Sequence, residues 1–206
     1  MKSNSPLVSL QHPAALRPGL LLVFAGLFAL LPPGAAAQTM RLSYFGETLT
    51  RYGLRTGLEH TLAAAESRSP AGRLRTHACI FATTLTLFRH PHNHLGLILA
   101  PEIGWRYTGG RGLILQAALT QGLFRSFYEG KTYEPGPGGA LRRVPLAGQW
   151  GYLPGCSAGF GQDLSRTGPS PLKWTVHAHY MAQMPYSTTF QHRFAIEFGI
   201  IHPLNP

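Results

Sequence analysis

The chain has 206 residues, with 18 lysines and arginines against eight aspartates and glutamates. Charged residues make up 13% of it, about half of the roughly 25% typical of soluble domains. No run of five or more basic residues occurs, which argues against a nucleic-acid-binding protein.

The N-terminal segment is typical of an export signal. Two basic residues precede an unbroken apolar run, GLLLVFAGLFALL, and prolines and a glycine then lead to three alanines at 35–37. The run is shorter than the roughly 20 residues of a membrane-spanning helix. We therefore expect a cleaved signal peptide over 1–37 and one mature domain over 38–206. The mature domain carries 16 basic and eight acidic residues, a net charge of +8.

The mature chain consists mainly of segments in which apolar and polar residues alternate, the period of a β-strand with two different faces. In the clearest segment Phe194, Ile196 and Phe198 alternate with Arg193 and Glu197. The pattern predicts eight strands, of which the first is the weakest, near 41–49, 51–62, 76–88, 95–107, 112–128, 151–163, 172–184 and 189–201.

Successive connections between the predicted strands would lie at opposite ends of an up-and-down barrel. Thr108–Arg111 predicts a tight hairpin, because Gly109 and Gly110 tolerate positive φ. The segment 63–75 is a longer connection, and 130–149, with five glycines and three prolines, is the one long loop. If both termini face the periplasm, the connections at 89–94, 129–149 and 185–188 lie outside the cell, as do the longest loops of membrane barrels.

Strand length favours a membrane barrel over a soluble sandwich. The predicted strands have about 11–13 residues, whereas soluble strands average about five or six and membrane-spanning ones need roughly 9–11. Aromatic residues near strand ends match the girdles of such barrels: Tyr52, Phe88, Trp105, Tyr107, Phe127, Tyr128, Trp174 and Phe190. We predict an all-β fold, a single antiparallel up-and-down barrel of about eight strands in a bacterial outer membrane.

The polar faces of these strands would then line the lumen. In a barrel of eight strands side chains just fill the interior, so opposite charges can pair there and a porin channel is not expected. The predicted polar network of the lumen comprises Arg55, Glu59, Glu102, Arg106, Gln116, His177, His179, Gln183, Arg193 and Glu197.

Three stretches carry a resemblance to a known family. SYFGETLTRYGLRTGLEHTL (43–62), LFRHPHNHLGLILAPEIGWRYTGGRG (87–112) and FRSFYEGKTYE (124–134) resemble a family of small, uncharacterised bacterial outer-membrane β-barrel proteins. The resemblance implies an outer-membrane barrel and carries no catalytic motif. In one departure, the last aromatic, Phe198, is followed by eight residues instead of ending the chain.

Histidines are the candidate metal ligands. His90, His92 and His94 alternate within one predicted turn and could bind a divalent ion, although no Cys or carboxylate stands beside them. A polar turn shaped by Pro91 and Asn93 is the favoured explanation of these histidines. His177 and His179 face the predicted lumen and could form a proton-sensitive cluster with a glutamate, or simply fill the interior. We expect no cofactor and no dedicated metal site.

An enzyme is a weaker alternative. Ser187, His192 and Glu197 supply the residue types of a lipid acyltransferase or deacylase, but His192 and Glu197 lie on opposite faces of one strand. Cys79 and Cys156 lie on non-adjacent predicted strands and are expected to be free thiols.

The sequence thus predicts a monomeric structural or surface-interaction protein without catalytic activity. Its partners are the bilayer and anionic outer-leaflet lipid or polysaccharide, which would be bound through Arg89, Lys131, Arg142 and Arg143. Two alternatives stay open: a soluble periplasmic barrel or sandwich that holds an apolar ligand, and a lipid-modifying membrane enzyme.

Overall fold

The structure is a computed structural model that describes residues 39–47, 51–136, 140–186 and 189–204. The predicted signal peptide and Ser187 lie outside the described residues. Eight long strands form the body of the protein, namely β1 (Thr39–Glu47), β2 (Arg51–Arg68), β3 (Leu74–His90), β4 (His94–Thr108), β5 (Leu113–Tyr128), β8 (Trp150–Asp163), β9 (Lys173–Tyr186) and β10 (Thr189–Pro203). Among the described residues, no helix is long and apolar enough to cross a membrane.

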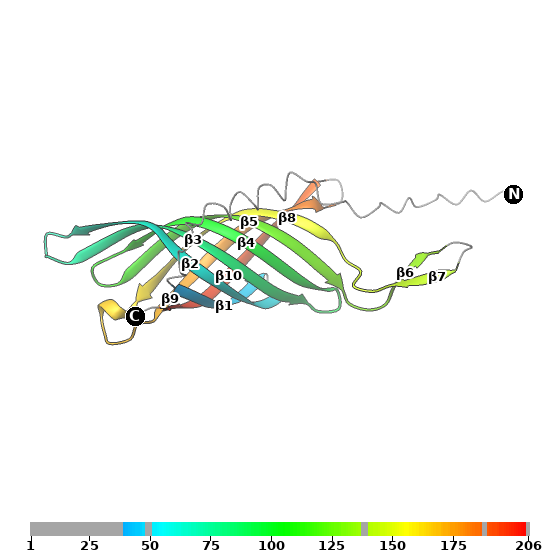
Figure 1. Cartoon of the computed structure of the whole chain (residues 1–206), viewed down its shortest axis with the longest axis horizontal. Coiled ribbons are helices and arrows are strands. Elements are labelled where there is room, and N and C mark those ends of the chain that lie inside the picture. Colours follow the sequence, from blue (N-terminus) through cyan, green and yellow to red (C-terminus); the bar gives the residue numbers. More distant parts are fainter. Residues whose placement is uncertain (1–38, 48–50, 137–139, 187–188, 205–206) are drawn as a thin grey trace.

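These strands close into an antiparallel barrel in the order β1-β10-β9-β8-β5-β4-β3-β2 (Figure 1). The first and last strands complete the ring, with a register from Thr39↔Pro203 to Glu47↔Ala195. The predicted up-and-down barrel of eight strands is therefore confirmed, including its weak first strand. We call the end that holds Thr39 and Pro203 the terminus end and the opposite end the loop end.

Two tight turns at the terminus end are built alike. In each, a glycine with positive φ donates its backbone N–H to a carbonyl three residues earlier: Gly72 to Ser69 and Gly112 to Gly109. A glycine at this position avoids the steric cost that a Cβ would bring. The hairpin predicted at 108–111 exists, but the residue with positive φ is Gly112, and neither Gly109 nor Gly110 adopts it.

The predicted connection over 63–75 is wrong in length. β2 continues to Arg68 and β3 begins at Leu74, so the turn occupies only 69–73. Pro70 and Gly72 shape this turn, whereas the small residues before it remain extended. The resulting β2–β3 ribbon extends beyond the other strands at one end of the molecule (Figure 1).

The long loop after β5 contains a short β-hairpin, which its glycine and proline content did not predict. Within it β6 (Thr132–Pro135) and β7 (Leu141–Val144) pair as a short hairpin, outside the barrel sheet. Figure 1 shows this hairpin projecting from the loop end.

The two faces of the wall differ in polarity. Large apolar side chains point outward on every long strand; Leu54, Phe194 and Ile196 are each more than 60% exposed. Phe88, which the sequence places in an aromatic girdle, is instead 1% exposed inside the barrel and packs against Phe124. Its even position in β3 puts it on the same face as Thr84 and Thr86, which are also buried.

Candidate functional site

The lumen of the barrel contains the densest set of charged groups in the described structure. All ten residues that the sequence assigns to the lumen are buried, and none is more than 7% exposed. The structure adds three buried polar residues from β1, which were missed because that strand has the weakest pattern: Arg41, Ser43 and Glu47. These residues occupy alternate positions with Phe45, and this period of two is the signal that could have assigned them to the inner face.

Arg41 is the centre of the ionic network near the terminus end. Its guanidinium lies 3.2 Å from a carboxylate oxygen of Glu59, 3.6 Å from Glu102 and 3.8 Å from Glu197. These glutamates belong to β2, β4 and β10. One side chain of the first strand therefore joins three other strands of the ring.

Two further arginines complete the network. Arg55 pairs with Glu102 and lies 3.4 Å from Glu197. Arg106 donates two hydrogen bonds of 2.6 Å to the two oxygens of Glu59, the bidentate geometry that gives strong arginine–carboxylate pairs. Three guanidiniums thus face three carboxylates, a balance that matters because an unpaired buried charge is costly.

The pairs cross between strands instead of running along them. The sequence shows Arg and Glu four residues apart in three strands, as in Arg55 and Glu59. Four residues of a strand span roughly 13 Å, which is too far for an ion pair. Arg55 and Glu59 accordingly bind different partners, and their spacing indicates a shared face only.

A second, smaller polar cluster lies toward the loop end. Arg193 pairs with Glu47 and donates to the side-chain oxygen of Gln183 at 3.0 Å, and Arg51 lies 2.6 Å from Glu47. The guanidinium of Arg193 also lies about 5 Å from the ring centres of Phe88 and Phe124, within the range of a cation–π contact.

An apolar plug separates the two polar clusters. It consists of Phe45, Phe88, Ile98, Ala100, Phe124, Leu153, Met181 and Ala195, all buried and packed together. A cavity beside the plug, lined in part by Arg55, Thr120 and His179, has a volume of about 10 Å³. This is close to the smallest space that holds one water molecule. The described side chains of the plug therefore pack closely beside this cavity.

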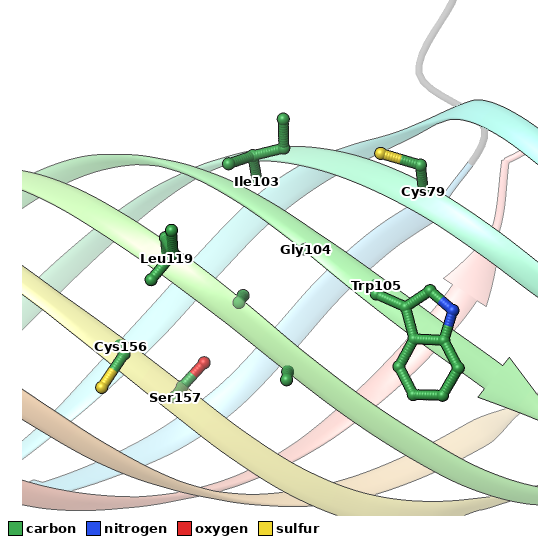
Figure 2. A pocket seen from close by; sticks show the side chains of 9 residues that line it. Cys79, Ile103, Gly104, Trp105, Leu119, Cys156 and Ser157 are labelled. Carbon is green, nitrogen blue, oxygen red and sulfur yellow. The ribbon is translucent and has the colours of Figure 1, made fainter.

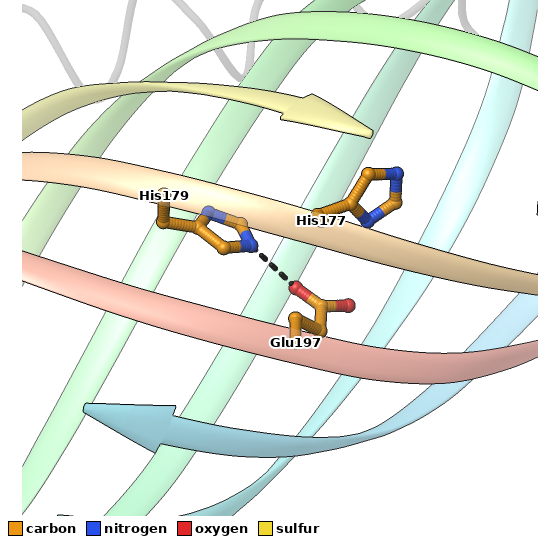
Figure 3. Close-up of side chains that lie close together, drawn as sticks. All are labelled: His177, His179 and Glu197. Carbon is orange, nitrogen blue, oxygen red and sulfur yellow. Dashed lines mark hydrogen bonds and ion pairs between the residues drawn. The ribbon is translucent and has the colours of Figure 1, made fainter. Parts of the chain in front are cut away.

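His177, His179 and Glu197 lie together on the inner wall (Figure 3). The nearest ligand atoms of the three residues are all within 4.8 Å of one another. His179 Nε2 is 2.9 Å from an oxygen of Glu197, whose other oxygen accepts a 2.6 Å hydrogen bond from Ser43.

The surroundings of this trio do not fit a resident cation. Both oxygens of Glu197 are engaged, and guanidinium nitrogens of Arg41 and Arg55 lie within 3.8 Å of them. A divalent ion here would disturb a balanced set of charges and be repelled by both arginines. We assign Glu197 and His179 to the ionic network. His177 fills the space over Gly159, where a Cβ would overlap its ring.

The structure does not bring the three histidines of the predicted turn together. His90 and His94 approach each other with ring centres 5.4 Å apart, while His92 is exposed at the turn with a φ of 62°. Among the described residues, no group of three ligand atoms forms there. A polar turn accounts for all three histidines.

The residues proposed for an enzyme are divided by the wall. Glu197 is 0% exposed in the lumen, whereas His192 is exposed on the outer face. His192 Nδ1 is instead 2.6 Å from the hydroxyl of Tyr180 on the neighbouring strand. Alternation places Tyr180 and His192 on one face, but it does not give the register between β9 and β10, so this outward-facing pair was not predicted.

An apolar depression lies on the outer wall between β3 and β8 (Figure 2). Its volume is about 440 Å³, and its lining includes Cys79, Trp105, Ala117, Leu119 and Cys156. The two cysteines are free, as expected, because β4 and β5 separate their strands.

Several basic residues at the loop end already have acidic neighbours. Arg89 lies 2.7 Å from Glu129, and Arg142 lies 2.6 Å from Glu134. The hydrogen bond from Arg89 lowers the pKa of the Glu129 carboxyl below its ordinary value. Lys131 and Arg143 form no ion pair with a described carboxylate. Of the four cations predicted to contact an anionic partner, these two therefore remain available for one.

Comparisons with known proteins add one distant likeness. Neither a protein-family model nor a curated protein matches this chain. The structure is similar to that described as the crystal structure of the outer membrane enzyme PagL, with a TM-score of 0.45 and 10% sequence identity. The match covers 81% of this chain and 99% of that one.

Proposed function

We propose that this protein is an integral outer-membrane barrel that conducts no solute and acts through the segments at its two ends. The observation that carries the proposal is the polarity of the wall, which is apolar outside and ionic inside. A water-soluble barrel would have the opposite arrangement. Phe194, Ile196 and Phe198 point outward on the same strand that buries Arg193 and Glu197.

Aromatic rings near both ends of the barrel support this placement. Trp105, Tyr107 and Trp174 lie on strand ends toward the terminus end, and Tyr52, Tyr128 and Trp150 lie toward the loop end. Amphipathic rings of this kind favour the boundary between lipid and water. The outer face between the two levels is the part that a bilayer would cover.

The alternative of a soluble carrier for an apolar ligand has little support in the lumen. Its walls are charged at two levels, and the plug between them leaves a space of about 10 Å³. Small-molecule sites are typically roughly 300–1,000 Å³.

Membrane integration can be tested directly. We expect the mature protein to stay with the membrane fraction in high salt and to be released only by detergent. We also expect the folded barrel to migrate differently from the boiled chain on a denaturing gel. Release by osmotic shock without detergent would contradict the proposal.

The loop end carries the proposed surface interaction. The β6–β7 hairpin projects from it and presents Arg143, with Lys131 close by in sequence. We propose that these cations contact anionic lipid headgroups or polysaccharide phosphate. The double variant Lys131→Gln/Arg143→Gln should weaken binding of the reconstituted protein to anionic lipopolysaccharide, whereas Arg111→Gln at the opposite end should not. Equal binding by both variants would refute this contact.

A lipid-modifying enzyme is the second candidate, and the observation that favours it is the exposed pair of Tyr180 and His192. A hydroxyl 2.6 Å from an imidazole nitrogen is the spacing needed for a histidine to accept a proton from a nucleophile. If the pair is catalytic, overexpression should alter membrane lipids and His192→Ala should abolish the change. Unchanged lipid profiles with the wild-type protein would remove this candidate.

A further inference from the structure

At the terminus end, β2 and β3 leave the barrel as a two-stranded ribbon, and no described strand covers the free edge of β2. β1 pairs with β2 only as far as Thr39↔Glu59, whereas β2 continues to pair with β3 as far as Arg68↔Leu74. Among the described strands, none lies against the other edge of Leu62–Arg68. Figure 1 shows the ribbon extending past the β4–β5 turn.

This edge lacks the proline and lysine that often prevent strand addition, and the β-bulge of the β2–β3 pairing lies only at its start, at Leu62. All side chains of Leu62–Arg68 are exposed, and the segment, LAAAESR, contains neither proline nor lysine. Alternate residues of an unpaired edge present free N–H and C=O groups to solvent. The segment spans roughly 20 Å at about 3.3 Å per residue. The alanines at 63, 64 and 65 leave space on both faces for larger side chains of an added strand.

The ribbon is also strongly basic. Arg68, Arg73 and Arg75 are exposed and form no ion pair with a described carboxylate, and Glu66 is the one acidic residue of the ribbon. Arg166, in the short connection after β8, donates a 3.2 Å hydrogen bond to Thr76 at the base of the ribbon. A strand that paired with this edge would therefore meet three arginines near the tip of the ribbon, where Arg68 and Arg75 lie on the two strands and Arg73 in the turn.

We propose that the edge Leu62–Arg68 is a docking site for an extended, acidic polypeptide segment, which adds to β2 as a further strand. Backbone hydrogen bonds would supply affinity, as in other cases of strand addition. The arginines would select a partner rich in Asp or Glu and speed its encounter. This interaction is separate from the surface contact proposed at the loop end and does not depend on it.

A second copy of this chain fits the edge less well. Edge-to-edge pairing of two ribbons would bring two sets of three unpaired arginines onto one surface, and like charges placed together are destabilising. The acidic partner is the occupant that the charge of the ribbon favours.

The proposal can be tested on the mature protein reconstituted in lipid nanodiscs. The probe is a set of fluorescent eight-residue peptides in which Glu alternates with Val or Thr. We expect saturable binding by anisotropy and slower hydrogen exchange of the amides of 62–68 when peptide is added. The double variant Arg68→Gln/Arg75→Gln should bind at least about tenfold more weakly, whereas Arg111→Gln on the next turn should change binding less than twofold.

Two control peptides separate strand addition from charge attraction. An acidic peptide that is N-methylated at every residue keeps its charge but loses its backbone N–H donors along both edges, so it should not bind. A peptide with Gln in place of Glu should bind at least about tenfold more weakly. Equal binding of either control, or no protection of 62–68 by any acidic peptide, would overturn the proposal.

A separate experiment tests whether a second copy of this chain occupies the edge. In a Cys79→Ser/Cys156→Ser background, Ala64→Cys should stay monomeric on mild oxidation. Efficient formation of a disulfide-linked dimer would show that a second copy occupies the edge, and the proposal would be wrong.

Discussion

The two faces of β10 differ in polarity and in burial within a few residues. Phe194, Ile196 and Phe198 are exposed on the outside, where the proposed bilayer would require no specific partner for them. Arg193 and Glu197, one residue away from them, are buried and held by named partners on other strands. The outer face thus tolerates many residues of one type, whereas the inner face depends on particular pairs. The predictions below test whether this difference is real.

The largest effect is expected on the inner face. Glu197→Leu removes a carboxylate that faces Arg41 and Arg55 and leaves both guanidiniums short of charge. Breaking a buried pair in this way costs about 3–5 kcal/mol. Urea unfolding in bilayers, followed by tryptophan fluorescence, measures the loss. The matched outer variant is Ile196→Leu, for which we expect a change below about 1.5 kcal/mol. Similar losses for the two variants would abolish the distinction between the faces.

A charge on the outer face should cost nearly as much. Ile196 is 64% exposed and lies midway along β10. Arginine near the middle of a bilayer destabilises a barrel by about 2–4 kcal/mol, so Ile196→Arg should lower the free energy of unfolding by that amount. The measurement is the same unfolding experiment in lipid. If Ile196→Arg is neutral, the outer face does not contact lipid and the membrane proposal fails.

Enlarging a small residue should destabilise the barrel more on the inner face than on the outer face. At Gly159 an added Cβ would overlap the ring of His177 and the carbonyl of Val176. Overpacking of this kind costs about 1–3 kcal/mol, so Gly159→Ala should destabilise the barrel. The neighbouring Ala158→Val points outward and should cost less. The double variant Gly159→Ala/His177→Ala should recover part of the loss, and no recovery would show that the backbone contact dominates.

The smallest effect concerns the exposed pair at the loop end. The hydrogen bond from Arg89 depresses the pKa of Glu129, so Arg89→Gln should raise that pKa toward its ordinary value. A depressed carboxyl pKa favours the paired state above the ordinary pKa, and the contribution disappears as pH falls through the lowered value. An NMR titration of Glu129 in both proteins measures the shift. Identical titration curves would show that Arg89 does not interact with this carboxyl in solution.

Strand alternation was sufficient to predict the barrel and to assign the ten lumenal residues to one face. It could not reveal that Arg106 pairs with Glu59 or that Arg41 joins three carboxylates, because these contacts depend on the register between strands. The turn at 69–73 was misjudged because alanines at 63–65 resemble a loop or helix in isolation. They remain extended because β3 pairs with them. Composition likewise concealed the β6–β7 hairpin, whose strands have only four residues each.

The position of Arg41 has a consequence for assembly. Its three carboxylate partners lie on β2, β4 and β10, so they surround it only after the last strand has met the first. In an open sheet, Arg41 would keep Glu59 on the adjacent strand, but Glu197 would stand at the opposite margin without Arg41 and Arg55. Closure of the ring therefore pairs Glu197 with two arginines and stabilises the finished barrel. An incompletely closed barrel lacks these pairs and is destabilised relative to the closed one.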